Sequence, residues 1–124
     1  ISQLLWWVAR AIGFGLMGTI AVLSLIDLSE SPSDDFLWDK LNHAIAYGVL
    51  AFWWACLLPG RRIVALLTAL TFGLAMELIQ AVLPYRAFEL ADMLANGIGA
   101  VAGVCIAMLL LPDGFQALWR RWAA

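Results

Sequence analysis

The sequence predicts an all-α integral membrane protein: a bundle of four transmembrane helices followed by a short interfacial helix at the C-terminus. Two observations support this fold class. Of the 124 residues, 65% are hydrophobic, and the mean hydropathy of +0.92 is too high for a soluble domain of this size to bury. Four apolar segments also approach the ~20 residues that a helix needs to cross a bilayer. We expect residues 1–124 to form a single transmembrane domain.

The four predicted spans follow one another closely along the chain. The first covers residues 7–26, and the lack of a small-residue cleavage signature after it indicates a retained span rather than a signal peptide. The second covers residues 41–58, after an acidic link, and a tight Pro-Gly-Arg-Arg turn leads into the third, residues 63–83. Pro84 ends the third span because proline cannot continue the helical hydrogen bonds. The fourth span covers residues 93–111.

The basic residues orient the predicted bundle. Of the seven Lys and Arg residues, five fall on one side of the predicted spans and two on the other. The positive-inside rule therefore predicts that both termini of this multi-pass protein face the cytoplasm. Behind the fourth span, Phe115, Leu118 and Trp122 repeat at helical spacing beside two arginines, which predicts a short helix in the cytoplasmic interface. The basic residues form no stripe, so nucleic-acid binding is not expected.

Glu77 is the only charged residue inside the third predicted span. A carboxylate at the centre of a spanning helix costs about 2.5–3.5 kcal/mol on insertion scales, so such a group usually faces the protein interior and has a partner. Gln80 follows within one helical turn. A structural role could be filled by glutamine at lower cost, so the acid at this position favours a functional site.

Two further helices are expected to bring polar side chains to the same outer level of the membrane as Glu77. Asp39, His43 and Tyr47 are spaced i, i+4 and i+8, which places them on one face of the second span. Asp92 and Asn96 share a face of the fourth span in the same way. The predicted polar cluster comprises Asp39, Lys40, His43, Tyr47, Glu77, Gln80, Arg86, Asp92 and Asn96.

Within this cluster we expect His43, Glu77 and Asp92 to be the candidate catalytic residues, with His43 or Glu77 as general base. Lys40 and Arg86 would hold a phosphate or carboxylate of the ligand. The remaining expected ligand-binding residues are Asp39, Tyr47, Gln80 and Asn96.

No metal and no cofactor are expected. A single histidine makes a metal site a poor hypothesis. The letters of residues 13–18, GFGLMG, match a dinucleotide-binding fingerprint, but that motif requires a preceding strand, and here it lies inside an apolar helix.

Each member of the cluster also has a structural interpretation. His43 could be a hydrogen-bonded structural residue, and Asp92 with Asn96 could cap the fourth span. Glu77 paired with Arg86 or Lys40 could lock the three helices together. Gly99 and Gly103 form a small-xxx-small face that favours helix packing, and they are also the expected contact of a possible homo-oligomer.

The motifs occur in a fixed order: Asp39-Lys40-x-x-His43-x-x-x-Tyr47, Glu77-x-x-Gln80, Pro84-x-Arg86 and Asp92-x-x-x-Asn96-x-x-Gly99. This ordered set resembles the signature of the VanZ-like membrane proteins, and it extends from Asp39 to Gly103. That family is named for an accessory protein of glycopeptide-antibiotic resistance that is linked to teicoplanin. The resemblance implies a bacterial inner-membrane protein of the cell envelope, but it implies no reaction.

We therefore expect the polar cluster to bind or modify a membrane lipid or another amphiphile in the outer leaflet. A lipid-linked envelope precursor, a phospholipid headgroup or a lipophilic glycopeptide such as teicoplanin would fit. Two alternatives stay open: a structural or partner-binding protein whose cluster locks the bundle, and a small ion-coupled transporter that would need to form oligomers.

Overall fold

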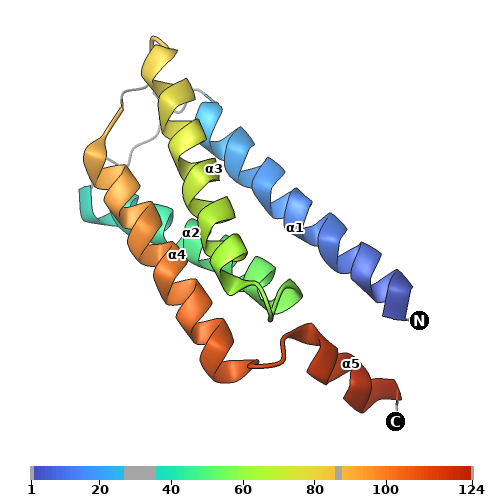
Figure 1. The fold of residues 1–124 in the computed structure, drawn as a ribbon. Coiled ribbons are helices and arrows are strands. Elements are labelled where there is room, and N and C mark those ends of the chain that lie inside the picture. Colours follow the sequence, from blue (N-terminus) through green and yellow to red (C-terminus); the bar gives the residue numbers. More distant parts are fainter. Residues whose placement is uncertain (1, 27–35, 86–87, 124) are drawn as a thin grey trace.

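A computed structural model describes residues 2–26, 36–85 and 88–123 of the chain, which form five helices and no strand (Figure 1). The helices are α1 (Ser2–Leu25), α2 (Phe36–Leu57), α3 (Arg62–Val82), α4 (Leu90–Leu110) and α5 (Phe115–Ala123). The predicted all-α class is confirmed for the described residues.

Two helices begin earlier than the apolar segments indicate. α2 starts at Phe36 instead of residue 41, and α4 starts at Leu90 instead of residue 93. Both carry an aspartate in the first turn, where the partial positive charge of a helix N-terminus stabilises a carboxylate. The helices therefore continue through polar turns that hydropathy alone assigns to the links.

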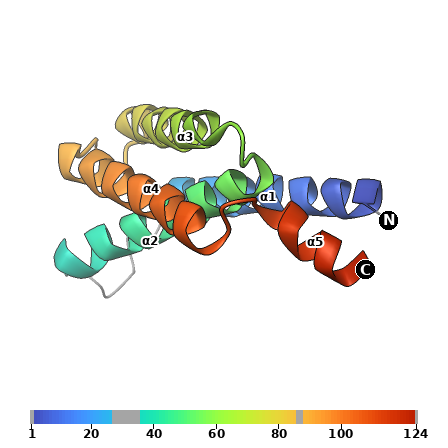
Figure 2. The same ribbon diagram turned by 60° about the horizontal axis from the view of Figure 1, so that its bottom comes forward.

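The helices alternate in direction, so α1 and α3 run one way while α2 and α4 run the other (Figure 1 and Figure 2). Both chain ends, α5 and the turn between α2 and α3 lie together at one end of the molecule. The opposite end, where α2 and α4 begin and α3 stops, is called the polar end below.

Among the residues that the structure describes, three segments are long and apolar enough to cross a membrane: Gln3–Leu25, Arg62–Val82 and Leu90–Trp122, the last of which includes α4 and most of α5. α2 has a similar length, but its first turns contain Asp39 and Lys40. These charges lower its hydropathy, so a membrane bundle is supported while the fourth crossing stays a prediction.

α2 packs most extensively against α4, and the contact is made by backbone against backbone. A Cβ atom at Gly99 would overlap the carbonyl oxygen of Ala44, and one at Gly103 would overlap that of Gly48. Glycines at this spacing allow two helices to approach closely. Gly99 and Gly103 are thus buried against α2 of the same chain. Both glycines also line an apolar space between α2 and α4, and a homo-oligomer through them stays a prediction.

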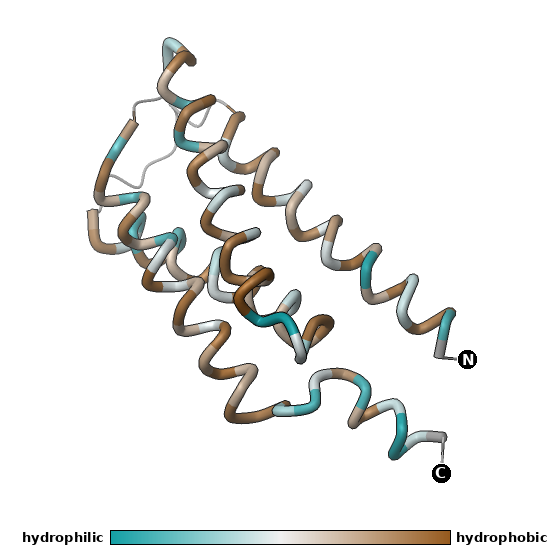
Figure 3. Tube along the Cα trace, viewed as in Figure 1, coloured by the Kyte–Doolittle hydropathy of each residue, from teal (hydrophilic) through white to brown (hydrophobic). Residues whose placement is uncertain are grey.

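The middle of α1 packs against the core, and hydrogen bonds tie the helix to the bundle near its two ends. Near its N-terminus, Trp53 of α2 donates its indole N–H to the carbonyl oxygen of Ala9, at 2.8 Å. Near its C-terminus, Gln80 of α3 donates to the carbonyl oxygen of Ser24, at 2.7 Å. Hydrophobic residues recur along α1, α3 and α4 (Figure 3), and many of their large apolar side chains are exposed, which suits a lipid environment.

The predicted C-terminal helix is present as α5, and aromatic rings dock it onto the bundle. Phe115 packs against Trp53 of α2 with ring centroids 4.7 Å apart. Trp119 meets Trp6 of α1 edge to face, at 5.0 Å. The exposed Arg120 extends from the same helix.

The corner between α4 and α5 depends on an arginine and a glycine. Arg62, at the start of α3, donates hydrogen bonds to the carbonyl oxygens of Leu111 (3.0 Å) and Pro112 (2.6 Å). Gly114 has a φ of 66°, and a Cβ there would overlap the carbonyl oxygen of Cys56. Only glycine fits this turn without strain.

Candidate functional site

Eight of the nine residues in the predicted polar cluster lie in the described part of the chain, and Arg86 lies outside it. α2 carries four of the eight, whereas α3 and α4 carry two each. The hydrophilic stretches of these three helices gather at the polar end (Figure 3). As their helical spacing predicts, the eight residues lie in one region of the molecule.

Lys40 is engaged by three carboxylates. Its ammonium nitrogen lies 2.8 Å from Asp39, 2.5 Å from Glu89 and in direct contact with Asp92. The side chains of Lys40 and Asp92 are 12% and 9% exposed, whereas those of Asp39 and Glu89 are about half exposed. Lys40 thus joins the first turns of α2 and α4, and a ligand anion would have to compete with these carboxylates for its charge.

His43 lies between α4 and the carboxylates. Its Nδ1 atom is 3.1 Å from the side-chain oxygen of Asn96. Its Nε2 atom is 3.5 Å from an oxygen of Asp92 and 3.9 Å from an oxygen of Asp39. The imidazole is half-buried and has protein groups near both nitrogens. It also lines the cavity described below.

Glu77 is almost completely buried, with 1% of its surface exposed. One of its carboxylate oxygens accepts a hydrogen bond from the backbone N–H of Glu89, at 3.3 Å. The carboxylate therefore ties α3 to the segment that leads into α4.

The buried Tyr47 extends over α3. Its ring lies against Gly73, next to the amide nitrogen of Asn96, and 6.2 Å from the ring of Phe72. Gly73 leaves the space that both side chains need, because a Cβ there would come 3.1 Å from Tyr47 and 3.2 Å from Asn96. Tyr47 and Asn96 therefore form the floor beneath His43.

The other predicted residue of α3, Gln80, points toward α1, where it donates to Ser24 as described above. One turn later, the Tyr85 hydroxyl donates to the carbonyl oxygen of Leu25, at 2.6 Å. These two bonds close the polar end on the side of α1.

A cavity of about 480 Å³ opens among these groups. Its lining consists of Asp39, His43, Gln80, Pro84, Tyr85, Glu89 and Asp92. A smaller, mostly apolar cavity of about 330 Å³ lies between α3 and α4, and Asn96 lines it. Since Asn96 also contacts His43, that pair of side chains lies between the two cavities. We call the first the polar cavity and the second the apolar pocket.

Two residues of the polar cavity were not anticipated from the sequence. Glu89 precedes α4 and contacts Lys40, and Tyr85 follows α3 and contacts α1. Glu89 stands three residues before Asp92, a spacing that would have placed it one turn away from that residue. Tyr85 offered no comparable signal, because its partner is a backbone carbonyl.

Asp39, His43 and Asp92 each place one potential ligand atom within 4.8 Å of the others, a geometry that could hold a cation. The ammonium of Lys40 already contacts both aspartates. A divalent ion would therefore compete with an internal positive charge, so this arrangement fits a metal poorly.

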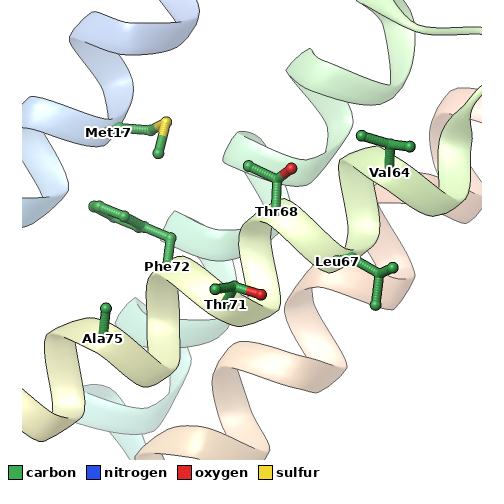
Figure 4. A pocket seen from close by; sticks show the side chains of 7 residues that line it. All are labelled: Met17, Val64, Leu67, Thr68, Thr71, Phe72 and Ala75. Atoms are coloured by element: carbon green, nitrogen blue, oxygen red, sulfur yellow. The ribbon is translucent and has the colours of Figure 1, made fainter.

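The other cavities lack such chemistry. Met17 of α1 and six residues of α3 line a space of about 510 Å³ (Figure 4). Its polar side-chain atoms are the hydroxyls of Thr68 and Thr71, and none of its lining side chains titrates. Another space, of about 490 Å³ between α2 and α4, is lined by apolar residues and glycines.

The comparisons with known proteins bear on this site. Residues 5–111 match the family model described as VanZ/LLP1, which includes all of the predicted polar cluster. The comparisons with curated proteins and with solved structures give no match.

Proposed function

The chain belongs to the VanZ/LLP1 family, and on that premise we propose that it is a bacterial cell-envelope protein whose polar cavity binds or modifies a lipid-linked or amphiphilic ligand. The proposed link to glycopeptide resistance is recognition of an acylated antibiotic such as teicoplanin, or of the envelope precursor on which such an antibiotic acts.

In the proposed topology α2 is the fourth membrane crossing and the polar end faces the outer leaflet of the inner membrane. Arg61, Arg62, Arg120 and Arg121 support this orientation, because they lie on the turn before α3, at the start of α3 and on α5, away from the polar end. The positive-inside rule then assigns both termini to the cytoplasm.

The observation that carries the proposal is the pairing of two cavities of opposite character. The polar cavity offers carboxylates, an imidazole and a phenol, while the apolar pocket beside it is lined mainly by Leu70, Leu74 and Met93. An amphiphile has the same division between a polar head and an apolar chain. A binding site for such a molecule needs convergent polar groups next to an apolar surface.

The charges of the polar cavity indicate which chemical groups the polar part of the ligand carries. Asp39, Glu89 and Asp92 line it, whereas Lys40 is not among the lining residues. Carboxylates accept hydrogen bonds, so hydroxyl or amino groups on the ligand would match these side chains better than a bare phosphate would. His43 is the proposed proton acceptor if the ligand is modified, and Glu77 is the buried acid beneath the cavity.

Binding can be measured on the purified protein in lipid nanodiscs, with teicoplanin and a polyprenyl-linked sugar as two separate probes. A glycopeptide without an acyl chain provides the ligand control. We expect His43→Ala and Glu77→Gln each to weaken binding by about tenfold or more, equivalent to about 1.4 kcal/mol. Asp113→Asn, at an exposed carboxylate beside α5, is the matched control and should bind as the wild type does.

The same variants can be tested for teicoplanin susceptibility in a bacterial host. If His43→Ala and Glu77→Gln fold normally and keep wild-type binding of every probe, the proposed site is wrong. If the control glycopeptide binds as tightly as teicoplanin, the apolar pocket does not bind the acyl chain.

One observation favours the structural alternative. Lys40 links Asp39 of its own helix to Glu89 and Asp92 at the start of α4, as a lock between helices would. Under this alternative, the Lys40 and Glu77 variants lose stability in detergent, while binding per folded molecule stays unchanged.

A further inference from the structure

His43 is the only histidine in the chain, and the groups around its ring treat the two nitrogens differently. Nδ1 points at the side-chain oxygen of Asn96, at 3.1 Å. Nε2 points toward the polar cavity, where its nearest protein groups are carboxylate oxygens of Asp92 and Asp39, at 3.5 and 3.9 Å.

This geometry selects one tautomer of the neutral ring. An amide oxygen can only accept a hydrogen bond, so with the Asn96 oxygen facing it Nδ1 is the nitrogen that donates in this contact. The lone pair of the neutral imidazole is then on Nε2. In proteins, the hydrogen bond at one ring nitrogen commonly decides which state the other nitrogen presents to a ligand.

Asn96 is itself held in place. It is 3% exposed on α4, and its amide nitrogen lies against Gly73 of α3 beside the ring of Tyr47. Any side chain at position 73 would crowd both groups, because a Cβ there comes 3.2 Å from the amide nitrogen. The amide therefore has little room to move, and in this position its oxygen lies toward His43.

We propose that Asn96 is a positioning residue that fixes the Nδ1-protonated tautomer of His43, so that Nε2 is the atom that exchanges a proton with a ligand in the polar cavity. This inference rests on the proposed function, and it assigns to the site acid–base chemistry on a hydroxyl-bearing or amino-bearing group. It also changes the role of Asn96 from ligand contact to support of the histidine.

The proposed step moves one proton to Nε2 of His43. The O–H bond of water or of a ligand hydroxyl breaks, its electron pair stays on the oxygen, and the lone pair of Nε2 forms the new N–H bond. The resulting imidazolium donates to Asn96 through Nδ1 and faces carboxylates at Nε2, which stabilise its charge. The charged groups on the surrounding elements are Asp39 and Lys40 on α2, Glu77 on α3, Glu89 before α4 and Asp92 on α4.

The tautomer can be observed directly by nitrogen NMR. Protein labelled with [¹⁵N]histidine, carrying a purification tag free of histidine and reconstituted in nanodiscs without added ligand, gives signals from His43 alone. We expect the neutral ring to show a protonated Nδ1 and an unprotonated Nε2 as its major form. The wild-type spectrum alone decides this point, so no variant needs to fold for the test to succeed.

Variants then test the cause. Asn96→Leu removes the acceptor and should shift the neutral ring to the Nε2-protonated tautomer, which faces Asp92 and Asp39. Asn96→Asp restores an acceptor at the same place and should restore the wild-type tautomer. Asn42→Leu makes the same exchange on the exposed side of α2, next to His43, and should leave the spectrum unchanged.

A major Nε2-protonated form in the wild type, or an Asn96→Leu spectrum identical to the wild type, would overturn the inference. The measurement uses no ligand, so its failure leaves the binding experiments untouched. Conversely, the expected tautomer in a protein that binds none of the probes would reject only the proposed function.

Discussion

Replacing Lys40 by methionine tests how strongly the polar end depends on one ammonium group. Methionine keeps most of the side-chain volume and removes the charge. Asp92 then loses the cation in direct contact with it while its side chain remains only 9% exposed. Asp39 and Glu89 lose the same partner, but both are about half exposed and can be hydrated.

The magnitude follows from this difference in burial. Removing one partner of a buried ion pair costs about 3–5 kcal/mol, because the other charge stays behind without compensation. An exposed ion pair contributes about 0–1 kcal/mol. The site borders a cavity and is not fully dry, so we expect Lys40→Met to lower the free energy of unfolding by about 3 kcal/mol, nearly all of it through Asp92.

A double-mutant cycle isolates the pair. Lys40→Met combined with Asp92→Asn removes both charges, so the double variant should be more stable than the sum of the single losses implies, by about 2 kcal/mol. Unfolding by SDS in mixed micelles, followed by tryptophan fluorescence, gives the free energies. Asp39→Asn is the matched control at an exposed partner, with an expected loss below about 1 kcal/mol.

Two results would refute the reasoning. If Lys40→Met costs no more than Asp39→Asn, then burial does not decide the strength of these contacts. If the losses of Lys40→Met and Asp92→Asn simply add in the double variant, the ion pair contributes nothing.

Two further predictions concern the packing of the bundle, both read from the same unfolding assay. Gly103→Leu should lower the free energy of unfolding by at least about 1–3 kcal/mol, because a side chain there meets the backbone of α2. Gly18→Leu has open space around it and should be nearly neutral. Equal losses in the two variants would contradict the close approach of α2 and α4. Arg62→Met removes two hydrogen bonds to the end of α4 and should cost about 1.5–3 kcal/mol, against little for the exposed Arg61→Met. Equal effects of the two arginine variants would rule out this role.

Most of the helical fold follows from the sequence, because long apolar segments separated by proline, glycine and charged residues permit few other arrangements. The helix starts do not follow in the same way. α2 begins at Phe36, and the polar turn that contains Asp39 and Lys40 keeps the helical conformation although its hydropathy is low. The same polar turn keeps α2 outside the segments that composition identifies as spanning.

The helices that contribute to the polar cluster were predictable, but the partners of the side chains were not. Helical spacing shows which side chains share a face, whereas the rotation and approach of whole helices decide what that face meets. Lys40, expected to hold an anionic ligand, contacts three carboxylates of the chain. Gln80, expected to face the ligand, lines the polar cavity and also donates to the backbone of Ser24. A backbone acceptor leaves no signature in a sequence.

The close contact between α2 and α4 has a consequence for how the protein is made. α3 emerges from the ribosome between these two partners, so a nascent chain that ends after Val82 contains α1, α2 and α3 but lacks the main partner of α2. In that intermediate Lys40 lacks its contacts with Glu89 and Asp92, and Gly48 lacks the close contact with Gly99. The polar end can therefore assemble only after the chain has been synthesised into α4.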